Sequence, residues 1–325
     1  MKSIPRWLVG LSLVLIVLAA VGGCGGPGHA AYLYKDSSSV VFVQWTRDGS
    51  SVSGSLTESS LDSGAVKSDS GAFTGTVSGS GVTLTFPKGL GTSVNITGTM
   101  SGSRLHLSFP QSDGTMSVVD LVGASTADYN SALGVLQQQA SQTNQQNAIE
   151  QARATLQSDL STLSQNTQAL SADGTSLASD LKSMQADVAT TYKDERGVLA
   201  EAQQYPDGNN GQVGAYAAHV AVDSGQVDND NGQVEAGTSQ ASNDIAAVQK
   251  DQDTVNADVA ALQSAQAQQP NYQANAQPTA DDVSNAEATA QTAIASLQQA
   301  VTQATDQANK LAATAQSYAD AVASL

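Results

Sequence analysis

Few side chains in this 325-residue sequence could perform chemistry. It contains one cysteine, Cys24, and three histidines that lie far apart. A single cysteine cannot form a disulfide framework, and this set leaves no Cys/His zinc site. The sequence also lacks a phosphate-binding glycine loop, a Gly-x-Ser-x-Gly turn and a His-Glu-x-x-His helix. We therefore predict that the protein is not an enzyme and uses no metal or other cofactor.

Cys24 follows a segment with the layout of a secretory signal. Lys2 and Arg6 precede an uncharged stretch over residues 7–23, and a positive start followed by an apolar run and small residues is typical of signal peptides. Residues 21–24 (VGGC) resemble the lipobox of bacterial lipoproteins. The resemblance implies cleavage before Cys24 and a thioether-linked diacylglycerol on its sulfur.

Such an anchor would place the protein on the extracytoplasmic face of a cell membrane. Two acyl chains, at about 0.8 kcal/mol per buried CH₂, hold a protein durably on a bilayer. Residues 24–30 would then form a short lipidated tether. An ordinary signal with an incidental cysteine, or an uncleaved anchor helix, is the alternative.

The charge of the chain is strongly acidic. A net charge of −17 and a pI of about 4.2 offer no basic surface, so we expect no nucleic acid partner. Nearly all of this charge comes from residues 125–325, where it favours a solvated face; a cation-dependent interaction is the alternative. Residues 228–232 (DNDNG) suggest a calcium loop, but Val227 and Thr238 would then occupy two ligand positions.

Residues 31–124 alternate apolar and polar side chains, which is the period-two pattern of half-buried strands. Turn signals separate the runs at residues 48–49, 63–64, 79–81, 89–91, 101–103 and 113–114. We expect about eight short strands in an antiparallel meander, closed as a small barrel or stacked as a sandwich. The last apolar face is expected at Met116 and Val118.

An internal repeat supports this interpretation. Residues 73–87 (FTGTVSGSGVTLTFP) and 96–110 (ITGTMSGSRLHLSFP) are identical at nine of fifteen positions, and each copy reads as one hairpin. The repeat aligns His106 with Thr83 on the polar face, so we expect His106 to point to solvent.

Three glycines fall on the apolar face of predicted strands: Gly54, Gly75 and Gly98. Glycine at such a position marks a sharp bend or a close approach of backbone. We expect that it allows the sheet to coil into a barrel. Alternatively, a ligand lies against the bare backbone, and these glycines with Trp45 would then bind an apolar molecule.

Residues 125–325 show a seven-residue period instead. Apolar or small residues recur at positions 149, 156, 163, 170, 177 and 184, then at 213, 220, 227, 234, 241, 248, 255 and 262, and finally at 283, 290, 297, 304, 311, 318 and 325. Sustained three- and four-residue spacing indicates a helical coiled coil.

Two breaks divide this helical region. Residues 205–211 (YPDGNNG) predict a tight reversal, so a helix near 148–204 would lie antiparallel to one over 212–267, each about 85 Å long. A linker over 268–278 contains two prolines, and Thr279 offers an N-cap for a third helix packed along the first two. Glycines around residues 223–238 favour local fraying of the second helix.

Together these features predict an α+β protein with separate domains: a signal peptide over 1–23, the tether, an all-β domain over 31–124, and a three-helix antiparallel coiled-coil rod over 125–325. We predict a lipid-anchored envelope protein with a structural or protein-interaction role, whose rod binds a partner protein or a second copy. A lipoprotein that binds a small apolar ligand inside the β-domain is the alternative.

Overall fold

A computed structural model describes residues 29–88, 92–110, 115–204, 211–272 and 278–324. The signal peptide, Cys24, most of the tether, two of the predicted turns and the centres of both helical breaks lie outside these residues. The chain divides between Asn147 and Ala148 into two compact units.

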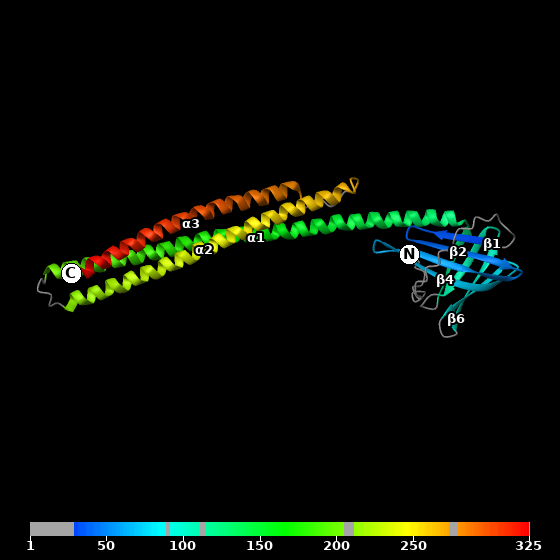
Figure 1. The fold of residues 1–325 in the computed structure, drawn as a ribbon, viewed down its shortest axis with the longest axis horizontal. Helices are drawn as coiled ribbons and strands as arrows, with labels where there is room; N and C mark the ends of the chain where they lie inside the picture. Colours follow the sequence, from blue (N-terminus) through cyan, green and yellow to red (C-terminus); the bar gives the residue numbers. More distant parts are fainter. Residues whose placement is uncertain (1–28, 89–91, 111–114, 205–210, 273–277, 325) are drawn as a thin grey trace. The chain divides into compact units, whose positions relative to one another are not determined.

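In the described part of the first unit, eight antiparallel strands close into a barrel (Figure 1). The strands are β1 (His29–Lys35), β2 (Ser39–Asp48), β3 (Ser51–Asp62), β4 (Ala65–Ser78), β5 (Gly81–Lys88), β6 (Thr92–Ser101), β7 (Arg104–Pro110) and β8 (Met116–Gly123). Each strand pairs with the next, and β8 pairs with β1 through Leu33 and Val122. The predicted meander is confirmed, and closure selects the barrel over the sandwich.

The turn chemistry explains why consecutive strands pair. Between β3 and β4, Ser63 and Gly64 both have positive φ, 52° and 81°. This is the geometry of a type I′ turn, whose twist matches the right-handed twist of a hairpin. Glycine adopts such a φ without steric cost, and a short polar residue tolerates it.

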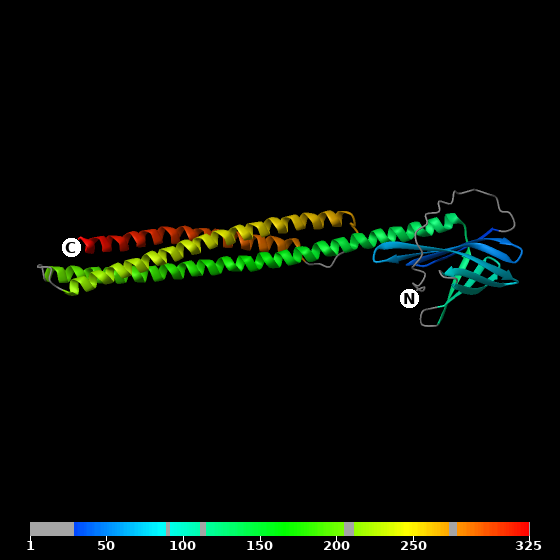
Figure 2. The same ribbon diagram turned by 60° about the horizontal axis from the view of Figure 1, so that its bottom comes forward.

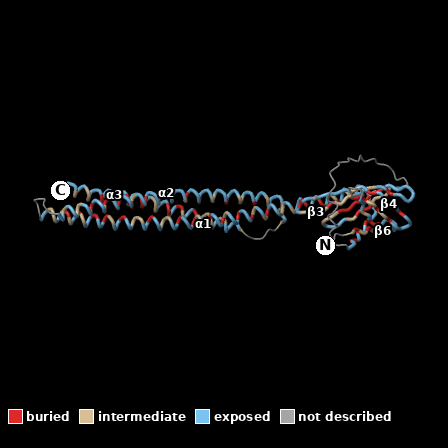
Figure 3. The backbone as a smooth tube through the Cα atoms, turned by 90° about the horizontal axis from the view of Figure 1, so that it is seen from below, coloured by how far each residue is buried: buried red, intermediate tan, exposed pale blue. Residues whose placement is uncertain are grey.

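Alternate residues of the strands form the apolar core of the barrel, and Figure 3 marks the buried residues along the backbone. The apolar faces expected from the sequence are buried for β2 to β5 and β7, whereas on β6 Ile96 is buried and Val94 and Met100 are half-buried. The expectation for β8 is wrong, because Met116 and Val118 are 54% and 57% exposed and Val119 and Leu121 point inward instead. Because β8 carries apolar side chains on both faces, the alternation alone could not show which face points into the barrel. The register that pairs Leu105 with Leu121 determines the inner face.

The outer face of β1 and β2 is covered by the first turns of α1 (Thr126–Gln204). Leu33, Val40 and Phe42 contact Ala132 and Leu136. This helix begins well before the predicted arm. Its start is capped, because the Ser125 hydroxyl accepts a hydrogen bond from the Asp128 N–H (3.2 Å) and the Ser125 N–H donates to the Asp128 carboxylate (2.8 Å).

The second unit is a bundle of three long helices (Figure 2). It contains the later part of α1 with α2 (Gly211–Ala267) and α3 (Ala280–Ala323). α2 runs antiparallel to the other two, and one apolar core joins all three. The predicted three-helix antiparallel bundle is confirmed. None of the described helices is apolar over a length that would span a membrane.

Two local predictions have different outcomes. Thr279 is the N-cap of α3, as expected: its hydroxyl accepts from the Asp282 N–H, and the Asp282 carboxylate accepts from the Thr279 N–H. Residues 223–238, where the glycines favour local fraying, are helical, and α2 is continuous over Gly211–Ala267. The helix continues through its glycines because Val220, Val227 and Val234 remain fully buried on its inner side.

Candidate functional site

The residues predicted to bind a ligand lie in the wall and core of the barrel, while Cys24 lies outside the described residues. Trp45 is 3% exposed, and its ring packs between Tyr32 and Phe73, with centroid distances of 5.1 and 6.2 Å. The interior around Trp45 is therefore occupied by the chain's own aromatic side chains.

The three glycines mark places where neighbouring strands approach closely. A Cβ at Gly54 would lie 2.0 Å from the carbonyl oxygen of Gln44, and one at Gly98 would lie 2.0 Å from that of His106. A Cβ at Gly75 would lie 2.2 Å from the carbonyl oxygen of Thr83. Coiling of a barrel wall requires this kind of approach. What lies against the bare backbone is thus the adjacent strand.

A small cavity opens elsewhere in the barrel. It has a volume of about 110 Å³ and is lined by Leu56, Glu58, Asp69, Ser70, Gly71, Ala72, Phe86 and Pro87. Burial, and secondarily the charge of Asp69, raises the pKa of Glu58. Drug-sized ligands usually occupy cavities of about 300–1,000 Å³. This volume therefore gives little support to the ligand-binding alternative.

The two described histidines with acidic neighbours lie in different units. His106 is on the outer face of β7, as expected, and contacts Asp120 on β8. His219 on α2 has its Nδ1 3.7 Å from an Asp194 carboxylate oxygen on α1. Sequence reasoning missed both acidic neighbours because each comes from another strand or helix.

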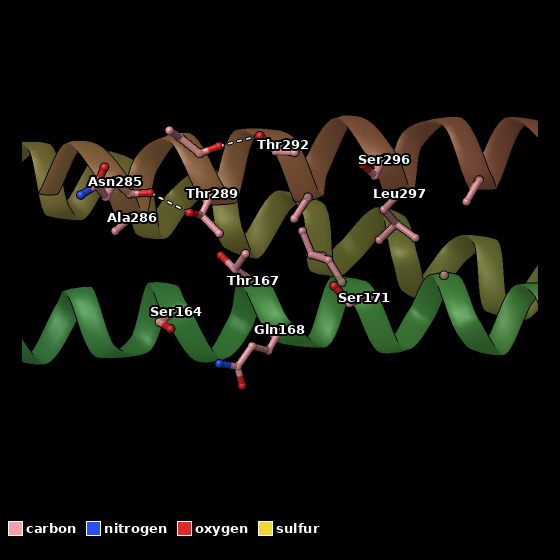
Figure 4. A pocket seen from close by; sticks show the side chains of 15 residues that line it. Ser164, Thr167, Gln168, Ser171, Asn285, Ala286, Thr289, Thr292, Ser296 and Leu297 are labelled. Atoms are coloured by element: carbon pink, nitrogen blue, oxygen red, sulfur yellow. Dashed lines mark hydrogen bonds between the residues drawn. The ribbon is translucent and has the colours of Figure 1, made fainter. Parts of the chain in front are cut away.

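A groove of the bundle lies between α1 and α3 (Figure 4). This groove has a volume of about 1,010 Å³, and its walls carry mainly Ala, Ser and Thr side chains. The hydroxyls of Thr289 and Thr292 already donate to carbonyl oxygens four residues earlier, at 2.7 and 2.8 Å. A second hollow of about 230 Å³ shares Gly174 and Ala300 with the groove and continues it towards Gln185.

A row of facing carboxyl groups runs between α1 and α2. We call it the acidic row and define it by the pairs Asp159–Asp258, Asp173–Asp244, Asp187–Asp230 and Asp194–Asp223. The members recur at multiples of seven residues on both helices. A step of one heptad forward on α1 corresponds to a step of one heptad backward on α2, so all four pairs belong to a single antiparallel register.

Two further positions continue this register with other residues. Asn166 faces Asp251, and its side-chain amide donates to the carboxylate at 2.7 Å. Asp180 faces Gly237, where a Cβ would lie 3.8 Å from an Asp180 oxygen. The acidic row is thus the greater part of a regular layer of polar contacts along the helical hairpin.

The environment of the acidic row disfavours the charged form of one carboxyl in each pair. Burial in the first place, and the facing carboxyl in the second, raises the pKa of Asp173, Asp187, Asp223 and Asp258. Asp230 is only 5% exposed, and its Oδ2 is buried without a hydrogen-bond donor among the described residues. Two carboxylates in contact cannot both ionise without a cost, so the arrangement favours one proton held between them.

The acidic row corrects part of the sequence interpretation. The charge of the helical region is not confined to a solvated face, because these carboxyls lie in the α1/α2 interface. The sequence contains a sign of this arrangement. An aspartate lies three residues after each of the heptad positions 156, 170, 184, 220, 227, 241 and 255. Residues 228–232 form ordinary helix within α2. Among the described residues, no cluster of three or more His, Cys, Asp or Glu side chains could hold a metal.

Comparison of the chain with models of known protein families and with curated protein sequences finds no match.

Proposed function

We propose that this chain is a lipid-anchored protein of the cell envelope, which uses its helical bundle to bind the helix of a partner protein. The observation that carries the proposal is the groove of about 1,010 Å³ between α1 and α3. Three helices leave this long face of the bundle open, and a fourth helix would complete it.

The anchor part of the proposal rests on the sequence around Cys24. The lipobox-like residues 21–24 end five positions before β1 begins at His29. A diacylglycerol on Cys24 would therefore hold the barrel within a few residues of the bilayer surface. The closed barrel suits this place, since it leaves no unpaired strand edge to associate with neighbouring proteins.

The shape of the groove supports a helix as its occupant. Its walls come from residues 164–174 of α1 and 285–300 of α3, and the second hollow extends it to Gln185. At 1.5 Å per residue this is a length of about 30 Å, or some 20 residues of helix. Small side chains at the contact allow two helix backbones to approach closely. The negative charge of the chain favours a partner helix whose flanks are basic.

The anchor is tested by Cys24→Ser. In cells fed a fatty-acid probe, the unmodified protein should be labelled and recovered with the membranes. The variant should lose the label and either remain unprocessed or leave the membrane fraction. Labelling that persists in the variant would exclude lipidation at this cysteine.

The groove is tested by filling it. Ser171→Trp and Ser296→Trp place an indole in the groove, whereas Ser179→Trp adds the same ring to an exposed position of α1 outside it. Full-length tagged proteins are cross-linked in intact envelopes and purified. Partners that use the groove should be lost with the first two variants and retained with the third. Equal recovery with all three would show that the groove is not the binding surface.

A further inference from the structure

We propose that the α1/α2 hairpin is a proton-controlled element: its helices hold together when each pair of the acidic row shares a proton, and separate more readily when both carboxyls of a pair are ionised. This inference rests on the α1/α2 interface and is independent of the anchor and of the groove.

The contact of Asn166 shows that this register places a hydrogen-bond donor opposite a carboxylate. There the amide of Asn166 donates to Asp251 at 2.7 Å, so a neutral donor on α1 faces a carboxylate on α2. Asparagine and protonated aspartic acid have nearly the same shape and both offer a donor. In the four Asp–Asp pairs, the same contact can form only if one carboxyl carries a proton. Without that proton, two negative charges face each other in a partly buried interface.

The other groups around the acidic row do not neutralise it. Gln226 donates to Asp230 at 3.0 Å, and Gln240 donates to both oxygens of Asp244, also at 3.0 Å. Asp223 adds a second negative charge beside Asp187. Among the groups that shift the pKa of Asp173, Asp187, Asp223 and Asp258, His219 is the one basic side chain, and none of these groups belongs to α3.

The sign of the pH dependence follows from proton binding. Because the pKa of Asp173, Asp187, Asp223 and Asp258 is raised in the folded chain, the folded state binds more protons than the unfolded state. Their contribution to stability is complete at pH values below the ordinary aspartate pKa. It is lost as the pH rises through the raised values, so the bundle should become more stable on mild acidification.

The N-cap of α3 acts in the opposite direction. Hydrogen bonds from the backbone and then the hydroxyl of Thr279 lower the pKa of Asp282. Its contribution is present above the ordinary aspartate pKa and is lost as the pH falls further. The stability of the bundle should therefore pass through a maximum in the acidic range.

The experiment measures the thermal unfolding of the full-length protein by helical circular dichroism between pH 8 and pH 4.5. We expect the midpoint of the helical transition to rise as the pH falls. The variant with Asp173→Asn, Asp187→Asn, Asp223→Asn and Asp258→Asn gives every pair one amide and one carboxyl group, as at Asn166 and Asp251. It should be more stable at pH 8 and show little change with pH. Asn166→Asp, which creates a fifth pair, should steepen the dependence.

A matched control separates pairing from overall charge. Asp228→Asn, Asp253→Asn, Asp306→Asn and Asp320→Asn remove the same charge from exposed positions. This variant should keep the pH dependence of the unmodified protein. If it flattens the dependence as much as the paired variant does, general repulsion is responsible and the proposal is wrong.

Two further readouts decide between a proton and a metal ion. The infrared band of protonated carboxyl groups should be present in the unmodified protein at pH values where ordinary aspartate is ionised, and should weaken in the paired variant. If millimolar Ca²⁺ or Mg²⁺ at pH 8 instead restores the stability seen in acid, the pairs hold a cation and the proton proposal is overturned.

Discussion

Single residues in this protein act through what faces them on the next strand or helix. Gly54 is an example, because the space that its missing side chain leaves is taken by the backbone of β2. Asn166 is another, since its amide is complementary to Asp251 only in one register of the hairpin. In both cases the residue type is explained by a neighbour that is distant in sequence.

The cost of adding a side chain at Gly54 is the prediction at this scale. Gly54→Ala would place a Cβ 2.0 Å from the carbonyl oxygen of Gln44, and strand backbone cannot move away without distorting the barrel. We expect a loss of about 2–3 kcal/mol in the free energy of unfolding of the barrel. Tryptophan fluorescence in a denaturant titration follows this transition, since Trp45 lies in the core.

Gly134→Ala is the matched control in the same unit. It lies in α1, and its added Cβ would meet no atom within 4 Å. Alanine at this exposed helical position should stabilise by up to about 1 kcal/mol. A Gly54→Ala barrel as stable as the unmodified one would show that the strands are not held at this separation.

The helices derive their stability from tertiary packing more than from their own sequence. α2 contains several glycines, each of which costs about 1 kcal/mol relative to alanine in a helix interior. It is nevertheless continuous because its valines at positions 227, 234, 248 and 255 are buried in the core that it shares with α1 and α3. Each alanine on the inner face of α3 buries little apolar area. The helices therefore need a long shared core to be stable.

Alanine substitutions along α2 test this balance. Gly225→Ala and Gly232→Ala add a Cβ with no atom within 4 Å, so each should raise the stability of the bundle by up to about 1 kcal/mol. At Gly237 the new Cβ would lie 2.9 Å from a buried Leu177 methyl, which should cancel the gain. The measurement is the midpoint of the helical unfolding transition. An equal gain at all three positions would mean that α1 and α2 are not packed in this register.

At the scale of the molecule, the chain joins two kinds of structure with different sources of cohesion. The barrel is held by a closed hydrogen-bond ladder around an aromatic and aliphatic core. The bundle is held by an apolar seam together with a layer of polar contacts between α1 and α2. The second arrangement can respond to its solution conditions, because protonation changes the polar layer and leaves the apolar seam intact.

The antiparallel hairpin itself is tested by cross-linking the full chain. In a Cys24→Ser background, cysteines at Asn166 and Asp251 should be joined within one chain by a short reagent, since these side chains are in hydrogen-bond contact. Moving the second cysteine to Asp244 shifts it by one heptad, about 10 Å, and should reduce the yield sharply. Products that form only between chains would indicate a parallel oligomer and contradict the hairpin.

Local patterns in the sequence were sufficient to predict the elements of the fold. Period two predicted the strands, period seven predicted the helices, and the glycine-containing turns predicted where most of them end. These patterns are readable because the backbone geometry of a strand or helix sets the spacing of side chains that share a face. For the same reason the solvent-facing position of His106 could be predicted, whereas the N-cap at Thr279 could be predicted because its hydroxyl can accept a hydrogen bond from the first turn of the helix.

Tertiary structure decided every feature that depends on two distant segments. It closed the sheet into a barrel, assigned the inner face of β8 and kept α2 helical across its glycines. It also brought the aspartates of α1 against those of α2, although each helix alone shows only a regular row of charges. Which side chain faces which across an interface is set by the register in which whole elements pack, and the periodicity of a single element does not contain that register.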